Sequence, residues 1–234
     1  MPALAWTAHL YTATGAALVL FAALAAERGD FRAAFVWLAA QVAVDASDGW
    51  WARRVRVDLH ARQVDGALLD NLVDYVAYVL VPVLIVIHAG LVPEAWAMPM
   101  GAAIMMASAY QFSRVDAKTD DHFFTGFPSY WNIVAFYLYA GGLSPWVNLA
   151  VLGWLVVMVF VPVGYVYPSR TPVLQGLTVA LGLAWGATVL YLIWILPDRW
   201  PAALVASLVF PGYYAGLSFA LHARRSTIRR AAPP

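Results

Sequence analysis

Four aspartates occupy regularly spaced positions on two neighbouring apolar segments of the chain. The first segment contains the stretch DASDGWWARR, in which Asp45 and Asp48 are three positions apart. The second contains Asp70 and Asp74, four apart, and Gly66 precedes Asp70 at the same spacing. Residues three or four apart share one face of a helix, so each segment predicts a stripe of carboxylates. Two such helices would present four acids to one another.

Small residues accompany these acids and leave room beside them. Gly49 and Ala52 continue the first stripe, and Gly66 begins the second. Such residues let two helix backbones, or a helix and a ligand, approach closely. An acid inside a bilayer costs about 2.5–3.5 kcal/mol on insertion scales, so four of them at membrane depth require a countercharge.

A divalent metal ion is the countercharge that this pattern favours. The nearby basic residues lie at the end of the first segment and beyond it, and the chain contains no cysteine. Oxygen ligands favour Mg²⁺, Mn²⁺ or Ca²⁺, and four carboxylates with room for phosphate suggest a two-metal site for phosphoryl chemistry. The alternative is that Asp45 and Asp48 cap or ion-pair near the interface, while Asp70 and Asp74 line a water-filled path.

The composition places these segments in a membrane. Hydrophobic residues make up 63% of the 234 residues and charged residues 12%, which is far outside the range of soluble proteins. Runs of roughly 20 apolar residues cross a bilayer as helices, and the chain divides into about eight of them. We place these runs near 6–26, 32–52, 66–88, 95–113, 128–143, 145–167, 172–196 and 200–222. The sequence therefore predicts an all-α polytopic integral membrane protein, with a single membrane-embedded domain over residues 1–234.

Basic residues fall mostly on one side of this arrangement. Of 14 lysines and arginines, only Arg28, Arg32 and Arg199 lie on the opposite side. Because cytoplasmic connections carry the excess of basic residues, the asymmetry predicts cytoplasmic termini and a cytoplasmic connection at 53–65. The net charge of +1 and the basic tail HARRSTIRR favour anionic lipid head groups, rather than nucleic acid, as partners of the tail.

The order of the acids and small residues resembles the signature of the CDP-alcohol phosphatidyltransferases. The matching positions are Asp45, Asp48, Gly49, Ala52, Arg53, Gly66, Asp70 and Asp74. Twelve residues, 54–65, separate the arginine from the second glycine. The usual signature is shorter here by roughly one helical turn, a difference that leaves the facing of the acids unchanged. The longer connection resembles that of the bacterial phosphatidylcholine synthases in this family, as does AKTDDHFFTGFPSYWNIVAFYLY at 117–139.

The resemblance implies a reaction, its cofactors and its partners. Members of the family transfer the phosphatidyl group of CDP-diacylglycerol to an alcohol and release CMP. The bacterial phosphatidylcholine synthases use free choline and form phosphatidylcholine. The resemblance further implies two Mn²⁺ or Mg²⁺ ions, a bacterial inner membrane location with the active site facing the cytoplasm, and a homodimer as one assembly state.

The resemblance also assigns roles to individual residues of this chain. The metal ligands would be Asp45, Asp48, Asp70 and Asp74. Asp74 would in addition be the catalytic base, because an unactivated choline hydroxyl needs a positioned proton acceptor. The residues around the cytidine nucleotide would be Gly49, Ala52, Arg53 and Gly66.

Aromatic residues are the candidates for binding the choline cation, which the faces of aromatic rings attract. The candidate rings are Tyr110, Tyr130 and Trp131, with Asn132 as a polar orienting group. Anchoring at the membrane interface is the alternative for each ring, because tryptophan and tyrosine are common there.

Two other functions fit parts of the pattern. A family member that uses serine, glycerol phosphate or inositol phosphate needs a basic pocket for its anionic acceptor. Arg114 and Lys118 keep this alternative open, although they are also candidates for the lipid phosphate and for positive-inside anchoring. A cation or proton transporter also uses intramembrane aspartates, but no inverted repeat or broken helix pair is evident in the sequence.

Overall fold

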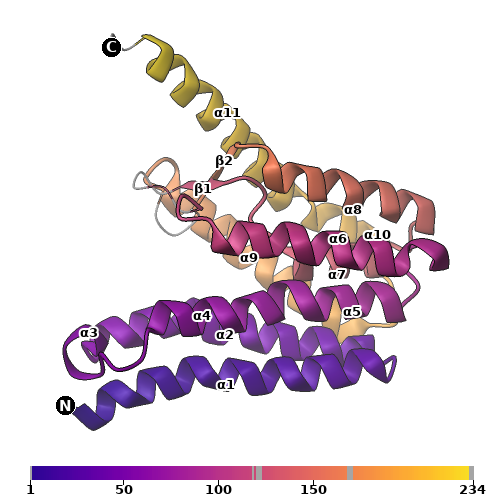
Figure 1. Cartoon of the computed structure of the whole chain (residues 1–234). Coiled ribbons are helices and arrows are strands. Elements are labelled where there is room, and N and C mark those ends of the chain that lie inside the picture. Colours follow the sequence, from indigo (N-terminus) through magenta and orange to yellow (C-terminus); the bar gives the residue numbers. More distant parts are fainter. Residues whose placement is uncertain (1, 118, 120–122, 168–170, 232–234) are drawn as a thin grey trace. The chain divides into compact units, whose positions relative to one another are not determined.

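The chain folds into helices that form two compact units, shown in the computed structural model in Figure 1. The structure describes residues 2–117, 119, 123–167 and 171–231. The first unit comprises Met1–Met105 with Tyr130–Leu149, and the second comprises Met106–Ser129 with Ala150–Pro234. Lys118, one of the two predicted lipid-phosphate contacts, lies outside the described residues.

The first unit is built on a pair of long helices. The helices α1 (Pro2–Glu27) and α2 (Phe31–Arg54) lie against each other and are joined by a tight turn (Figure 1). Asp30 caps the start of α2, because its side chain accepts a hydrogen bond from the backbone N–H of Ala33 at 3.0 Å. A short helix, α3 (Val57–His60), lies in the connection that follows α2.

A third long helix contains a π-helical turn in its middle. It runs as α4 (Gly66–Tyr75), the π turn η1 (Val76–Leu80) and α5 (Val81–His88). Within it, the backbone N–H of Val81 donates to the carbonyl of Val76, five residues earlier. Such turns are rare in proteins and occur frequently at functional sites, because the wider turn changes the direction of the side chains around it.

The remaining helices of the first unit include two that continue into the second. These two are α6 (Glu94–Ser113) and α8 (Pro145–Phe160). Between them in the first unit is α7 (Trp131–Gly141), which packs against α5 and η1. This packing brings the predicted choline segment beside the helix that carries Asp70 and Asp74.

The second unit contains a small antiparallel sheet that an all-helical prediction does not include. The strands β1 (Phe123–Thr125) and β2 (Gly164–Val166) pair with Phe124 opposite Tyr165. Each strand has three residues, which is too short to give a recognisable alternating pattern. The sheet fixes one end of the connection that follows α6.

The other helices of the second unit pack against one another. They are α9 (Gln175–Ile195), α10 (Pro201–Ser207) and α11 (Val209–Ala231). The last of these contacts β2, and Leu221 on it forms a buried cluster with Phe123 and Val166. The sequence predicts one span over 200–222. The structure has two consecutive helices there, α10 and α11, and Pro201–Arg224 forms one stretch that is long and apolar enough to cross a membrane.

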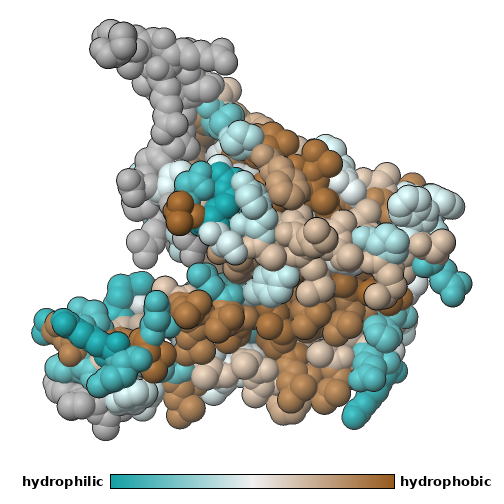
Figure 2. Space-filling model, in the orientation of Figure 1, coloured by the Kyte–Doolittle hydropathy of each residue, from teal (hydrophilic) through white to brown (hydrophobic). Residues whose placement is uncertain are grey.

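Four helical stretches of the described residues are long and apolar enough to cross a membrane. They are Leu4–Glu27, Gly66–His88, Gln175–Ile195 and Pro201–Arg224. In the first unit, Figure 2 shows hydrophobic residues gathered over α4 and α5, with polar residues at both ends of this band. Leu68 and Leu72 on α4 are 56% and 60% exposed, as expected for side chains that face lipid. The chain is thus a helical integral membrane protein, and the count of eight spans stays a prediction.

Candidate metal and substrate site

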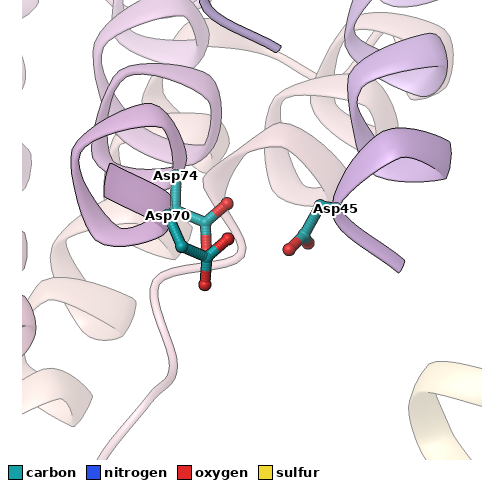
Figure 3. Close-up of side chains that lie close together, drawn as sticks. All are labelled: Asp45, Asp70 and Asp74. Atoms are coloured by element: carbon teal, nitrogen blue, oxygen red, sulfur yellow. The ribbon is translucent and has the colours of Figure 1, made fainter. Parts of the chain in front are cut away.

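Three of the four predicted metal ligands come together between two helices of the first unit. Asp45 lies in the second half of α2, and Asp70 and Asp74 lie on α4. Each offers a carboxylate oxygen, and these oxygens lie within 4.8 Å of one another. Figure 3 shows the side chains of the two α4 acids on one side of the site and Asp45 reaching toward them from the other. Three of the four acids that the spacing predicts to face one another therefore do meet.

The first helix, α1, packs against the two helices that carry the acids, α2 and α4. At Gly15, an added Cβ would lie 2.8 Å from Cγ1 of Val73 and 3.8 Å from Cγ of Gln41. Glycine is required there because any side chain would push α1 away from α4. Sequence reasoning missed this residue, since a single glycine in an apolar helix gives no signal of what it contacts.

Asp48, the fourth predicted ligand, points to a different neighbour. Its Oδ2 accepts a hydrogen bond of 2.7 Å from the hydroxyl of Thr12 on α1. It does not belong to the group of oxygens within 4.8 Å that the described residues form. The structure thus brings together three of the four acids and places Asp48 one helical turn farther along α2.

Tyr78 is a site residue that sequence reasoning missed. It lies in η1, and its hydroxyl donates a hydrogen bond of 2.6 Å to Oδ2 of Asp45. Its ring meets that of Tyr130 edge to face, with centroids 6.2 Å apart and planes at 63°. The spacing of four residues from Asp70 to Asp74 continues to position 78, and this repeat is the signal that could have found it.

The predicted nucleotide-binding residues lie beside the acids on the same two helices. Arg53 is exposed near the end of α2, and its Nη1 would be 3.3 Å from a Cβ added to Gly49. The missing side chain of the glycine therefore lets the guanidinium fold back along the helix. Ala52, which is half-buried, completes this small-residue surface.

Gly66 begins α4 and is covered by an imidazole from the first helix. A Cβ added there would be 3.3 Å from Cε1 of His9. The ring is 7% exposed, and its Nε2 donates to the carbonyl of Ala61 at 3.1 Å. Because a carbonyl oxygen only accepts, this contact assigns the ring proton to Nε2. His9 thus ties α1 to the connection between α3 and α4.

The predicted choline-binding residues at the start of α7 differ in exposure. Tyr130 is half-buried and contacts Tyr78. Trp131 is 2% exposed and Asn132 is 9% exposed, and the Asn132 Oδ1 accepts from the backbone N–H of Ile133. A ring as buried as Trp131 contributes mainly to the core of the unit. Tyr130 is the member of this segment that the structure places next to the acids through Tyr78.

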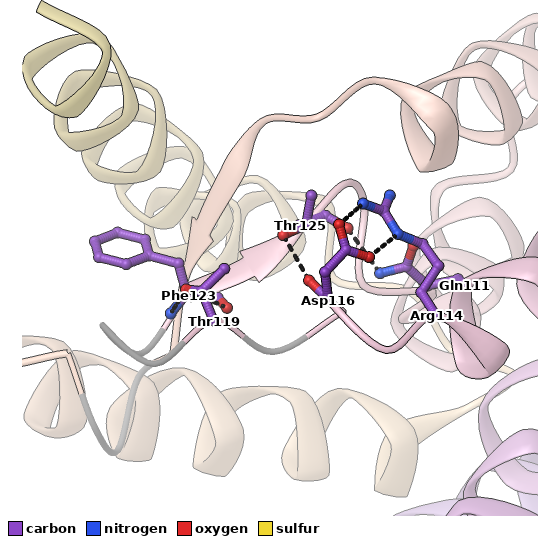
Figure 4. Close-up of polar contacts among 6 residues, drawn as sticks. All are labelled: Gln111, Arg114, Asp116, Thr119, Phe123 and Thr125. Atoms are coloured by element: carbon purple, nitrogen blue, oxygen red, sulfur yellow. Dashed lines mark hydrogen bonds and ion pairs between the residues drawn. The ribbon is translucent and has the colours of Figure 1, made fainter. Parts of the chain in front are cut away.

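The two other predicted contacts among the described residues, Tyr110 and Arg114, belong to the second unit. Figure 4 shows Arg114 and its neighbours. Arg114 Nε and Nη2 donate to the carboxylate of Asp116 at 2.7 and 2.6 Å. This hydrogen-bonded ion pair raises the pKa of Arg114 and lowers the pKa of Asp116. The guanidinium also lies 5.6 Å from the ring centroid of Tyr110. The connection is held further by Gln111, whose amide donates to the carbonyl of Thr125 at 2.9 Å.

Comparison with known proteins gives consistent relatives along nearly the whole chain. No family model matches the chain. It is 40% identical over 222 residues to a phosphatidylcholine synthase of Legionella pneumophila, covering 92% of this chain and 87% of the relative. It is 32% identical over 213 residues to a phosphatidylcholine synthase of Pseudomonas aeruginosa, covering 91% and 90%. With one of Borreliella burgdorferi it shares 30% identity over 218 residues, covering 93% and 92%. The chain therefore belongs to the phosphatidylcholine synthase family.

Proposed function

We propose that the chain transfers the phosphatidyl group of CDP-diacylglycerol to free choline, forming phosphatidylcholine and releasing CMP. Support comes from its membership of the phosphatidylcholine synthases, together with the signature residues of the two acid-bearing helices. The observation that carries the proposal is the meeting of Asp45, Asp70 and Asp74 within 4.8 Å at the point where the signature expects a metal site.

The three carboxylates fit a divalent cation. Oxygen donors from two helices converge on one space, and this donor set suits Mg²⁺ or Mn²⁺. We assign Asp45, Asp70 and Asp74 as ligands and Asp48 as the ligand of a second ion. When bound, the two ions would neutralise the diphosphate, polarise the phosphorus and stabilise the departing CMP oxygen.

Asp74 is the proposed catalytic base as well as a ligand. The hydroxyl oxygen of choline attacks the phosphorus bonded to the diacylglycerol oxygen, and the bond from that phosphorus to CMP breaks. The hydroxyl proton passes to the carboxylate of Asp74, whose Oδ1 is buried. A carboxylate at this position raises the nucleophilicity of an alcohol that is otherwise weak at neutral pH.

The remaining residues are assigned to the substrates. Gly49, Ala52 and Gly66 leave space for the cytidine nucleotide, and Arg53 contacts its phosphates. The choline-binding residues are Tyr130, with Tyr110, Trp131 and Asn132 as the other candidates. The lipid-phosphate contacts are Arg114 and Lys118. Arg114 already donates from Nε and Nη2 to Asp116, so a phosphate would bind through the remaining N–H groups or displace this carboxylate.

The enzyme is proposed to act in the bacterial inner membrane with eight spans, as a subunit of a homodimer. Both termini and the active site face the cytoplasm. The basic connection at 53–65 directly follows the helix that carries Asp45, which supports this orientation. Choline and CMP dissolve in water whereas the other two reactants are lipids, so the site opens to the cytoplasm and to the leaflet.

The testing experiment is CMP release by the purified protein in detergent with CDP-diacylglycerol and Mn²⁺. Choline, serine, glycerol phosphate, inositol phosphate and no acceptor are compared. We expect release that requires choline and stops on chelation of the metal. Release with another acceptor would overturn the choline assignment. No release with any acceptor, together with cation flux in vesicles, would favour a transporter.

A further inference from the structure

A hydroxyl group from outside the acid cluster donates a hydrogen bond to one of its three carboxylates. Tyr78 donates a hydrogen bond of 2.6 Å to Oδ2 of Asp45, the acid that α2 contributes to the site. Asp70 and Asp74 lie four residues apart on one helix, so they share a face of it. Asp45 lies on α2, so its side chain must be oriented separately toward the other two acids. A phenol donating to a carboxylate at this distance makes a short, charge-assisted hydrogen bond.

The backbone around Tyr78 is unusual in a way that suits this contact. The residue lies in the middle of the π turn η1, four positions after Asp74. A π turn inserts extra length into a helix and rotates the side chains within it relative to a regular α-helix. The turn therefore sets the direction in which the phenol leaves the helix that carries two of the acids.

We propose that Tyr78 is a positioning residue that holds Asp45 in the orientation needed to bind a divalent cation together with Asp70 and Asp74. The inference rests on the proposed function, since it requires the acid cluster to be a metal site. The donated proton offsets part of the charge that three close carboxylates accumulate, and it restricts the rotamers of Asp45 before the ion arrives. Contacts of this kind change metal affinity by about 10- to 100-fold in other proteins.

Asp48 receives a parallel contact from another helix. Thr12 on α1 donates its hydroxyl to Oδ2 of Asp48 at 2.7 Å. Each acid of α2 is thus held by one hydroxyl from a neighbouring helix, Asp45 from η1 and Asp48 from α1. This parallel argues that hydroxyl donors orient the acids of α2, which lack the fixed four-residue spacing of the α4 pair.

The ring of Tyr78 has a second contact that must be separated from the action of its hydroxyl. The ring meets Tyr130, a predicted choline-binding residue, edge to face. Replacement of Tyr78 by phenylalanine removes the hydroxyl and keeps the ring. A role in binding choline through the ring would survive this change, whereas a role in positioning Asp45 would not.

The test is direct Mn²⁺ binding to the purified protein in detergent, measured by the loss of the free Mn²⁺ signal in electron paramagnetic resonance without substrates. We expect Tyr78→Phe to raise the Mn²⁺ Kd by about 10- to 100-fold. We also expect the Mn²⁺ dependence of CMP release to shift by a similar factor, while the choline KM stays within about twofold of wild type. Combining Tyr78→Phe with Asp45→Asn should add little to the loss caused by Asp45→Asn alone.

The chain offers two matched controls. Tyr75 lies three residues before Tyr78 and donates its hydroxyl to the carbonyl of Met105 at 3.0 Å. Tyr11 lies next to Thr12 and shares a hydrogen bond of 2.8 Å with Ser47. Tyr75→Phe and Tyr11→Phe therefore each remove a tyrosine hydroxyl without touching an acid, and both should bind Mn²⁺ as the wild type does.

The outcomes separate the inference from the proposed function. If the wild type does not bind Mn²⁺ or Mg²⁺, the metal site itself is wrong. If the wild type binds Mn²⁺ and Tyr78→Phe binds it equally well, only the positioning role of Tyr78 is wrong. If Tyr75→Phe weakens binding as much as Tyr78→Phe, the effect is a general loosening of this helix, and the positioning role is again overturned.

Discussion

Two groups of acids differ in what lies next to their carboxylates. One group lies on α2 and α4, and the other is the acid in the connection after α6. Asp45, Asp70 and Asp74 bring their carboxylate oxygens within 4.8 Å of one another. Asp116, by contrast, accepts hydrogen bonds from both Nε and Nη2 of Arg114. Carboxylates that crowd together raise one another's energy, and a cation relieves this repulsion. An acid that already faces a guanidinium has little to gain from a metal ion.

The difference teaches that the arrangement of acids, rather than their number, distinguishes the candidate metal site. Both regions contain aspartates within a few residues of one another. In the first region, acids from α2 and α4 lie close together, and hydroxyl groups donate hydrogen bonds to Asp45 and Asp48. In the second region the acid serves the fold of a connection, where it also accepts from Thr125 through its backbone carbonyl.

The largest effect should come from removing one charge from the cluster. We expect Asp74→Asn to lower the rate of CMP release by about 10³-fold or more, because the amide neither accepts the choline proton nor ligates a metal well. Binding of CDP-diacylglycerol should survive in part, measured by retention of the labelled lipid. Asp116→Asn is the control from the other region and should keep near-normal turnover. Retained turnover in Asp74→Asn would rule out the base assignment.

The sequence predicted that Asp45, Asp70 and Asp74 lie close together because helix geometry determines which positions share a face. It also placed Asp48 with them, but Asp48 lies outside this group. The spacing of four residues puts Asp70 and Asp74 on one face of α4, and the stripe that contains Asp45 turns it toward them. The same spacing does not say which neighbouring helix each side chain meets. The spacing thus did not predict the contact between Asp48 and Thr12. It also did not predict that the hydroxyl of Tyr78 donates to Asp45, because no sequence pattern indicates the π turn in which Tyr78 lies.

The fold was predictable in class and less so in detail. Hydropathy identified a helical membrane protein, but the helix α2 is not among the four stretches that are long and apolar enough to span. Its hydropathy is lowered by its acids and arginines, including Asp45 and Arg53. The pairing of β1 with β2 was missed because two three-residue strands far apart in the chain leave no periodic signal.

The second-largest effect tests the backbone on which the connection after α6 depends. Gly126 has φ +81°, and an added Cβ would lie 2.3 Å from the carbonyl oxygen of Val159. We expect Gly126→Ala to lower the free energy of unfolding by roughly 1–3 kcal/mol, because the backbone must shift to accept it. Unfolding in detergent can be followed by tryptophan fluorescence.

Gly29→Ala is the control for this effect. Gly29 has a similar φ of +75°, but an added Cβ there would have no atom within 4 Å. This variant should lose only the cost of the left-handed conformation, about 1–2 kcal/mol at most. Equal losses in both variants would mean that the contact with Val159 does not hold the connection in place.

A smaller effect should distinguish the tyrosines of the two regions. Tyr130 contacts Tyr78 beside the acids, whereas Tyr110 packs on Phe160 and already faces the cation of Arg114. We expect Tyr130→Ala to raise the choline KM by about 5- to 30-fold, the equivalent of a desolvated cation–π contact, and Tyr110→Ala to raise it less. The reverse order would assign choline to the second unit.

Trp131→Ala is a poorer probe of choline binding, although the sequence offers Trp131 as a candidate. The side chain is 2% exposed, so its removal leaves a cavity that should cost about 3–5 kcal/mol of stability. An equal change in the KM values for choline and CDP-diacylglycerol would identify this structural damage. A selective rise in the choline KM would restore Trp131 to the binding site.

The smallest effect should follow from opening the ion pair between Arg114 and Asp116. A lipid phosphate would compete with the carboxylate of Asp116 for the guanidinium, so the net gain on binding would be small. We expect Arg114→Gln to raise the KM for CDP-diacylglycerol by about two- to fivefold, within the range of an exposed ion pair, without changing the choline KM. Asp116→Asn frees the guanidinium and should lower the same KM slightly. If both variants keep the wild-type KM, Arg114 does not bind the lipid phosphate and only stabilises the connection after α6. Arg114 and Asp116 would then both be structural residues, in contrast to the acids of the proposed metal site.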